Sequence, residues 1–283
     1  MRSLAGRVVI VTGASSGIGA VTASRLAAHG AIVILAARRS EQLTQVRDAI
    51  VAAGGNAIAV TADVTEDAGR AAIVDAALRV NGTIDILINN AGYGQRGAIE
   101  AVPIDRIREN FEANVFAPLA LTQRVLPILR AQGHGRIINV NSVAGRIARP
   151  YSSIYDATKH AMEALSDGLR EELAPFGIDV VAIQPGFIKT EFGAVASSRA
   201  MSSDVYAANQ KVYDDADASR RKYVGQPEDI AAIILEAATD PRPRTRYAAP
   251  MHARVALLLR RILSDRLFYR FILGSRPPSR SGT

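Results

Sequence analysis

Thr12-Gly13-Ala14-Ser15-Ser16-Gly17-Ile18-Gly19 is the stretch of sequence that decides the fold. A short apolar run, residues 7–11, comes before it, and a segment with helical period, residues 18–28, follows it. Three glycines between a strand and a helix let the backbone approach a pyrophosphate closely, and the helix N-terminus then points at the phosphates. Glycines also occur in turns for steric reasons alone. Because this turn opens a βαβ unit, it predicts a dinucleotide site.

The rest of the chain repeats this alternation of short apolar runs and longer segments of helical period. Strands are predicted at residues 7–11, 32–36, 57–62, 84–89, 136–141 and 180–183, and helices at residues 18–28, 41–53, 67–80, 104–130 and 155–175. The strands are apolar on both sides, which indicates a parallel sheet covered by helices on two faces. The predicted fold class is α/β with a doubly wound parallel sheet, and ligands in such folds bind beyond the carboxyl ends of the strands.

Length and composition favour one principal domain. The chain has 283 residues, of which 48% are hydrophobic, enough for one substantial core. We expect a dinucleotide-binding catalytic domain over residues 1–241 and a basic, apolar helical extension over residues 242–274. Residues 275–283, rich in Pro, Ser, Gly and Arg, are expected to be disordered.

The net charge of +7 is concentrated in the C-terminal part of the chain. From residue 242 onward there are ten arginines and one acid, so this part carries +9 and residues 1–241 carry −2. We find no nucleic-acid recognition motif and expect no nucleic-acid partner. Two explanations of the basic C-terminal part remain open: a solvated face that favours solubility, and contact with a membrane surface.

Several classes of site and location are disfavoured by what the sequence lacks. Without cysteine there is no disulfide, thiolate metal site or cysteine nucleophile, and the four histidines lack metal-ligand spacing, so we expect no metal. The N-terminal apolar run is too short for a signal peptide, and no run reaches the roughly 18 apolar residues of a membrane span. We expect a cytoplasmic protein, with membrane association left open.

The apolar residues of 247–273 follow a helical pattern, with arginines along and beside them. Two interpretations remain open: a helix in a membrane interface, or a helix packed on the enzyme or on a sister subunit.

The end of the second predicted strand bears on which dinucleotide is bound. NAD-selective sites usually place an acid there to accept hydrogen bonds from the ribose hydroxyls, and such an acid would repel a 2′-phosphate. Here the position holds Ala37, followed by Arg38 and Arg39, whose guanidinium groups suit a phosphate. We therefore expect NADP(H) to be favoured over NAD(H). Arg38 is the favoured phosphate ligand, whereas for Arg39 a solvent-exposed position at the strand end is an equal alternative.

A second cluster consists of Ser142, Tyr155 and Lys159. The Tyr-x-x-x-Lys spacing puts both side chains on one helical face. A free tyrosine has a pKa near 10, so a nearby ammonium that favours the phenolate is what acid–base chemistry near neutral pH requires.

With these motifs, the chain resembles the short-chain dehydrogenase/reductase family, whose fold is Rossmann-type. The resemblance covers about residues 6–190 and rests on Thr12 to Gly19, Asn89-Asn90-Ala91-Gly92, Asn114, Ser142, Tyr155, Lys159 and Pro185-Gly186. It implies that Tyr155 is the general acid or base, that Ser142 orients the substrate oxygen, and that Lys159 lowers the tyrosine pKa and binds the nicotinamide ribose. Asn114 would support a proton-relay water. The implied cofactor-binding residues are Gly13, Ser15, Ser16, Gly17, Ile18, Gly19, Arg38, Arg39, Asp63, Val64, Asn90, Ala91, Gly92, Tyr155, Lys159, Pro185, Gly186, Ile188 and Thr190.

The resemblance further implies an NADP(H)-dependent oxidoreductase that moves a hydride between the nicotinamide and an alcohol or carbonyl carbon. Residues 185–190 are similar to those of members that act on steroids, retinoids and other lipophilic alcohols. A homodimer or homotetramer is expected. Specificity should come from residues 143–150 and from a candidate lid, residues 190–223, with Phe192, Met201, Tyr206 and Tyr213 as candidate wall residues. The alternative is a catalytically silent NADP-binding regulatory or scaffolding protein of the same fold.

Overall fold

Seven parallel strands form a single sheet in the order β3-β2-β1-β4-β5-β6-β7. The computed structural model describes residues 3–201, 203–220 and 224–272. The strands are β1 (Val8–Thr12), β2 (Ile32–Ala37), β3 (Asn56–Thr61), β4 (Ile86–Asn89), β5 (Gly135–Val140), β6 (Ile178–Pro185) and β7 (Arg246–Ala249). The predicted doubly wound α/β class is confirmed.

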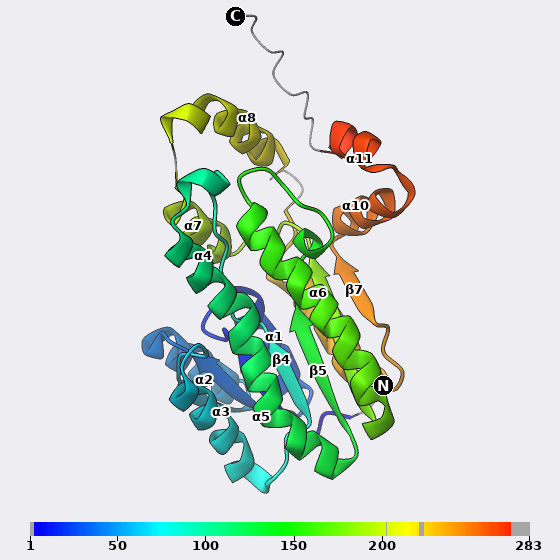
Figure 1. Cartoon of the computed structure of the whole chain (residues 1–283). Coiled ribbons are helices and arrows are strands. Elements are labelled where there is room, and N and C mark those ends of the chain that lie inside the picture. The colour runs from blue at the N-terminus through cyan, green and yellow to red at the C-terminus, as the bar shows by residue number, and fades with distance from the viewer. Residues whose placement is uncertain (1–2, 202, 221–223, 273–283) are drawn as a thin grey trace, which may run out of the picture.

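Helices cover both faces of the sheet (Figure 1). One face packs against α1 (Gly17–Ala28), α2 (Ser40–Ala52) and α9 (Pro227–Thr239), and the other against α3 (Asp67–Asn81), α5 (Ala117–Gln132) and α6 (Ser153–Leu173). Alternate residues of β1 supply the two cores: Val9 and Val11 belong to the first, Val8 and Ile10 to the second. This explains why the strand reads as a continuous apolar run.

The chain reverses its direction of winding at β1. This strand pairs with β2 on one side and with β4 on the other, so the loops that follow β1 and β4 diverge to opposite faces. A crevice at the carboxyl ends of these strands follows from the topology alone.

The helix predicted over residues 104–130 is not uniform. It comprises α4 (Ile104–Phe111), the π-helical segment η2 (Glu112–Phe116) and α5. Pro118 lies in the first turn of α5, and Pro127 lies in its interior. A π-helical turn accommodates an extra residue within a helix and is frequent at functional sites. Apolar periodicity does not reveal such a turn.

The expectation of a helix from Tyr247 onward is wrong for the first three residues. Residues 246–249 form β7, with Tyr247 and Ala249 buried and Arg246 and Ala248 half-buried. This alternation has the strand period, but over four residues it is too short to stand out beside the helical segment that follows. The helices themselves are α10 (Met251–Ile262) and α11 (Asp265–Ile272). The predicted disordered tail, residues 275–283, lies outside the described residues.

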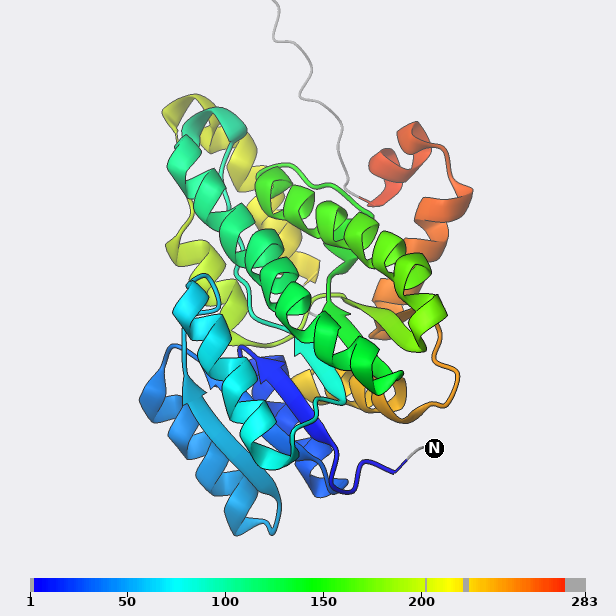
Figure 2. The ribbon, with the colours of Figure 1, turned by 60° about the horizontal axis from the view of Figure 1, so that its bottom comes forward.

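Smaller elements lie around the carboxyl end of the sheet. They are η1 (Ile99–Ala101), η3 (Val143–Gly145), α7 (Glu191–Ser198) and α8 (Asp204–Arg220). The short helix η4 (Ala174–Phe176) lies at the other end of the sheet, between α6 and β6. In Figures 1 and 2, α7 and α8 lie on one side of the carboxyl end and α10 and α11 on the other. Within the described ranges, no helix is long and apolar enough to cross a membrane.

Candidate active site

A cleft of about 810 Å³ opens at the carboxyl ends of the strands. It brings together nearly all the residues that the sequence assigned to cofactor binding. Those that line it are Gly13, Ser15, Ser16, Gly17, Ile18, Arg38, Arg39, Asp63, Val64, Asn90, Ala91, Gly92, Tyr155, Lys159, Pro185, Gly186, Ile188 and Thr190. Gly19 is buried behind the glycine loop, where an added Cβ would lie 2.3 Å from the carbonyl oxygen of Gly13. Its role is therefore close packing of helix against turn.

The glycine loop presents a helix N-terminus to the cleft. Ser16 precedes α1, and its side chain makes no capping hydrogen bond to the helix. The first N–H groups of the helix thus remain available for an anion. Asn90 holds the loop from below, because its Nδ2 donates to the carbonyl oxygens of Thr12 at 2.9 Å and Gly13 at 3.2 Å. The N–H groups at the N-terminus of α1 fit the pyrophosphate of a dinucleotide.

Two arginines lie at the end of β2. Arg39 donates from Nη2 to the hydroxyls of Ser15 at 3.2 Å and Ser16 at 2.6 Å, and its Nη1 lies 2.8 Å from a carboxylate oxygen of Glu191. It therefore lies across the glycine loop, with 45% of its side chain exposed. Arg38 has a side chain that is 68% exposed, and its nearest carboxylate contact is with Asp63 at 3.6 Å.

The carboxyl group of Asp63 is held in its charged form. Partial burial acts to raise its pKa, but hydrogen bonds from Thr65 and the charge of Arg38 outweigh this and lower the pKa below its usual value. The backbone N–H and the hydroxyl of Thr65 donate to Asp63 Oδ1 at 2.9 and 2.8 Å. Asp63 thus has a fixed orientation at the edge of the cleft.

Ser142, Tyr155 and Lys159 meet at the other end of the cleft. Ser142 follows β5, and its Oγ accepts a hydrogen bond from Ala144 N at 3.1 Å and donates to Pro185 O at 3.4 Å. Tyr155 and Lys159 lie one turn apart on α6. Lys159 Nζ donates to Val140 O at 3.0 Å and lies 5.9 Å from the centre of the Tyr155 ring.

Burial moves the pKa values of this pair apart. It raises the pKa of Tyr155 to about 12, against the lowering effects of the Arg149 charge and the Ser142 hydrogen bond. Burial also lowers the pKa of Lys159 to about 8, opposed by the charge of Glu163. At neutral pH the tyrosine therefore keeps its proton, and the lysine is charged below about pH 8. This arrangement can donate a proton to an oxygen placed beside Tyr155.

Asn114 belongs to the wall behind the cleft. It lies in η2, is 2% exposed, and uses Oδ1 to accept from Tyr93 N at 3.0 Å. Its Nδ2 donates to Tyr93 O at 2.9 Å and to Thr158 Oγ1 at 3.1 Å. The side chain thus ties the loop after β4 to the residue before Lys159.

The candidate wall residues are dispersed. Phe192 lines the cleft, with its ring centre 5.4 Å from that of Tyr155. Tyr206 donates to Glu100 at 2.6 Å, and Tyr213 packs on Tyr151 at 5.5 Å. Met201 pairs with Gly97. These three residues link α8 and the residues before it to other parts of the protein. Spaced aromatic residues more often pack helices together than contact a substrate.

Two ionic groups near the site were not assigned from sequence. Arg149 pairs with the buried Asp156 at 2.7 Å, and its guanidinium lies 5.9 Å from the centre of the Phe187 ring in the cleft. Glu163 is 3% exposed and lies one turn beyond Lys159. The sequence held a usable signal for Glu163, since residues 155, 159 and 163 share one helical face that must be buried if Tyr155 is.

The family model for short chain dehydrogenase matches residues 7–200. An uncharacterized oxidoreductase of Bacillus subtilis is 36% identical over 264 residues, covering 90% of this chain and 92% of the relative. An NADPH-dependent 3-dehydrocapnine reductase of Ornithobacterium rhinotracheale is 33% identical over 282 residues, covering 93% and 96%.

A crystal structure of a short chain dehydrogenase/reductase from Burkholderia phymatum in complex with NAD superposes with a TM-score of 0.83. The two chains are 27% identical, with 99% of this chain and 100% of that one covered. The family match and the site geometry agree with each other. The chain belongs to the short chain dehydrogenase family and is an NAD(P)-dependent oxidoreductase that acts on CH–OH or C=O groups.

Proposed function

We propose that the enzyme uses NADP(H) in preference to NAD(H) to interconvert a lipophilic alcohol and its carbonyl compound. The observation that carries the cofactor preference is the pair Arg38 and Arg39 at the cleft, with Ala37 in place of an acid. A guanidinium group attracts the 2′-phosphate that distinguishes the two cofactors. The relatives do not decide which cofactor this chain prefers, since one is named NADPH-dependent and another was solved with NAD.

We propose catalytic roles for four side chains. The cofactor, when bound, supplies or accepts the hydride. Tyr155 donates its phenolic proton to the substrate oxygen in reduction and accepts it back in oxidation, while Ser142 holds that oxygen by a hydrogen bond. Lys159 favours the phenolate by its charge, and Asn114 fixes the wall behind the pair.

The substrate end of the cleft supports a lipophilic substrate. Its lining includes Val143, Phe187, Phe192, Val195 and Val224. A mostly apolar wall with a few convergent polar groups is the usual form of a small-molecule site. We propose that α7 and α8, within residues 190–223, act as a lid over this end.

The test is NADPH oxidation at 340 nm across a panel of lipophilic ketones, aldehydes and quinones, repeated with NADH. Turnover with NADPH at a kcat/KM at least about tenfold above that with NADH is expected, because one charge-assisted contact contributes about 1.5–3 kcal/mol. NADPH binding without turnover of any compound would instead favour the regulatory or scaffolding alternative.

We further propose that α10 rests on an anionic membrane surface, from which a lipophilic substrate would be taken up. Met251, Val255, Leu258 and Ile262 form one stripe along the helix and are 69%, 47%, 57% and 64% exposed. Arginines at positions 254 and 261 are exposed beside the stripe, and two more, at 266 and 270, are exposed on α11. An apolar face edged by arginines complements anionic lipid headgroups.

We expect the double variant Leu258→Glu/Ile262→Glu to lose flotation with vesicles that contain phosphatidylserine, because two carboxylates then face the anionic headgroups. Val51→Glu is the matched control, since Val51 is 54% exposed on α2, far from α10. Flotation unchanged in the double variant contradicts the proposal. If the wild type bound no lipid and the double variant eluted as a smaller species in size-exclusion chromatography, the stripe would instead be a contact between subunits of the expected homodimer or homotetramer.

A further inference from the structure

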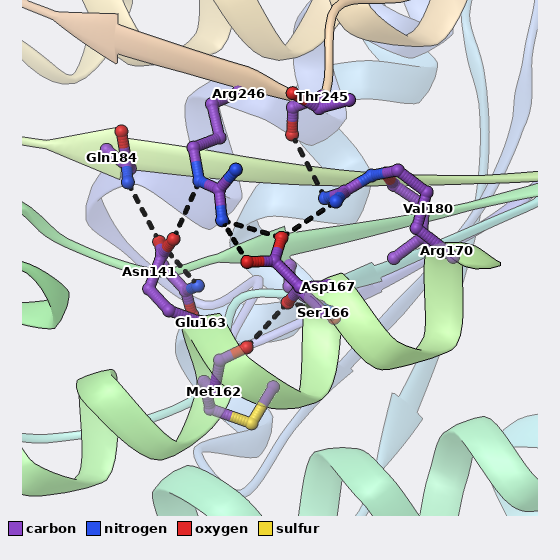
Figure 3. A network of polar contacts seen from close by, with 11 residues as sticks. Asn141, Met162, Glu163, Ser166, Asp167, Arg170, Val180, Gln184, Thr245 and Arg246 are labelled. Atoms are coloured by element: carbon purple, nitrogen blue, oxygen red, sulfur yellow. Dashed lines mark hydrogen bonds and ion pairs between the residues drawn. The ribbon is translucent and has the colours of Figure 1, made fainter. Parts of the chain in front are cut away.

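Glu163 is a buried carboxylate that the proposed chemistry does not use. It lies on α6 with 3% of its surface exposed. Three side chains donate to it (Figure 3): Asn141 Nδ2 at 2.9 Å and Gln184 Nε2 at 3.0 Å, both to Oε1, and Arg246 Nε at 2.9 Å to Oε2. A buried charge with this many donors is well satisfied.

The donors of Glu163 are adjacent in sequence to residues of the active site. Asn141 directly precedes Ser142, and Gln184 directly precedes Pro185, whose carbonyl oxygen accepts from Ser142 Oγ at 3.4 Å. One carboxylate oxygen therefore fixes the ends of both β5 and β6. These two ends carry the serine and the backbone group that orients it.

The aliphatic part of the Glu163 side chain also packs against the turn that follows Ser142. A Cβ added to Gly145 would lie 2.7 Å from Glu163 Cγ and 2.8 Å from the carbonyl oxygen of Lys159. The turn η3 is thus in close contact with α6 at this point. A side chain at position 145 would force η3 and α6 apart at this contact.

The charged groups around Glu163 come from two elements. From β7, Arg246 approaches it and also donates from Nη2 to Asp167 Oδ1 at 2.6 Å. From α6 itself come Lys159, one turn before, and Asp167, one turn after, the latter paired also with Arg170 at 2.7 Å. The contacts from the residue after β5 and from β6 are the neutral amides of Asn141 and Gln184.

Structural stability alone does not require a carboxylate at this position. Replacing a buried ion pair by well-packed apolar residues is often neutral or stabilising. Lys159, by contrast, loses hydration on burial and donates a hydrogen bond to Val140 O. The negative charge of Glu163 opposes the lowering of the lysine pKa.

We propose that Glu163 is a positioning residue for this active site: it fixes the ends of β5 and β6 beside Ser142 and supplies the negative charge that keeps Lys159 protonated. The role in turnover rests on the proposed function. The effect on Lys159 does not, so it is measured separately from activity.

The first measurement is a pH titration of the lysine side chains by NMR. The chain contains four lysines, so protein labelled with ¹³C-lysine gives four Cε signals, and Lys159→Arg identifies the one from Lys159. In Glu163→Gln we expect the Lys159 pKa to fall by about one unit or more, as removal of a charge about 6 Å away in an effective dielectric of about 20 predicts. Gln has the same shape, so packing is retained.

Asp167→Asn is the matched control. Asp167 is also on α6 and also pairs with Arg246, but its side chain is 45% exposed, and the amides of Asn141 and Gln184 donate to Glu163 instead. We expect this variant to leave the Lys159 pKa within about 0.3 unit, because solvent screens an exposed carboxylate. An equal shift in both variants, or none in Glu163→Gln, overturns the proposal.

The second measurement is the pH dependence of kcat for carbonyl reduction. Lys159 must be charged, so its pKa of about 8 sets the alkaline limit of activity in the wild type. In Glu163→Gln this limit should move to lower pH by the same amount as in the NMR titration. A merely structural role would lower activity at every pH without moving the limit.

Asn141→Ala keeps the proposal testable if Glu163→Gln does not fold, as judged by circular dichroism. It removes one of the two amide donors beside Ser142 and leaves the charges in place. We expect kcat to fall by about 10- to 100-fold through misplacement of Ser142, with the NADPH dissociation constant unchanged within about twofold. An unchanged kcat overturns the proposal. Absence of turnover in the wild type refutes the proposed function instead, and the NMR result still stands.

Discussion

Tyr155→Phe is expected to lower kcat by about 10³-fold while leaving the NADPH dissociation constant within about twofold of the wild type. The change removes only the phenolic hydroxyl, the group that delivers the proton. The ring, which packs edge-on against Phe192 at 5.4 Å, remains in place. Steady-state kinetics at saturating NADPH and a fluorescence titration of NADPH measure the two quantities separately.

Tyr151→Phe is the control for loss of the hydroxyl from a buried tyrosine residue. Tyr151 is 8% exposed, like Tyr155, but its ring packs on Tyr213 of α8. We expect this variant to keep kcat within about threefold of the wild type, because surroundings away from the chemistry tolerate such a change. Retention of more than about a tenth of the activity by Tyr155→Phe would show that the proton comes from another group.

Arg38→Asp is expected to raise the KM for NADPH by about 10- to 100-fold and the KM for NADH by less than about threefold. The variant replaces a cation by a carboxylate that repels the 2′-phosphate, an effect of about 1.5–3 kcal/mol. Arg38 can turn toward a ligand because its side chain is 68% exposed and lies 3.6 Å from Asp63. Initial rates with each cofactor in turn provide the measurement.

Arg39→Ala and Arg47→Asp complete this comparison. Arg39 contacts the hydroxyls of Ser15 and Ser16, so its loss should weaken binding of both cofactors through the glycine loop. Arg47 lies on α2 and pairs with its neighbour Asp48, so its loss should affect neither cofactor. If Arg38→Asp weakened NADH and NADPH equally, Arg38 would not bind the 2′-phosphate.

The sequence was sufficient for those parts of the fold that depend on local pattern. Each strand from β1 to β6 was predicted to within two residues or so at its ends, because a continuous apolar run between helical segments has few alternatives. The glycine loop and the Tyr155–Lys159 pair could also be identified from the sequence, since each consists of residues close together in the chain. The prediction failed at β7, whose four residues are too few to establish a period.

Contacts between residues far apart in the chain could not be predicted. Glu163 contacts Asn141, just after β5, Gln184 from β6 and Arg246 from β7, and the last of these is 83 residues away in the sequence. The position of Arg39 likewise depends on Ser15 and Glu191, which only the folded chain brings together. No periodicity marks such pairs, because each forms only after the sheet has been assembled.

The position of β7 has a consequence for how the protein is made. During synthesis the ribosome releases β1 to β6, the glycine loop and the Tyr155–Lys159 pair before it releases Arg246. A nascent chain at that stage already carries every reacting group, yet the carboxylate of Glu163 still lacks its guanidinium partner. The hydrogen-bond network around Glu163 is therefore completed only when the last strand docks.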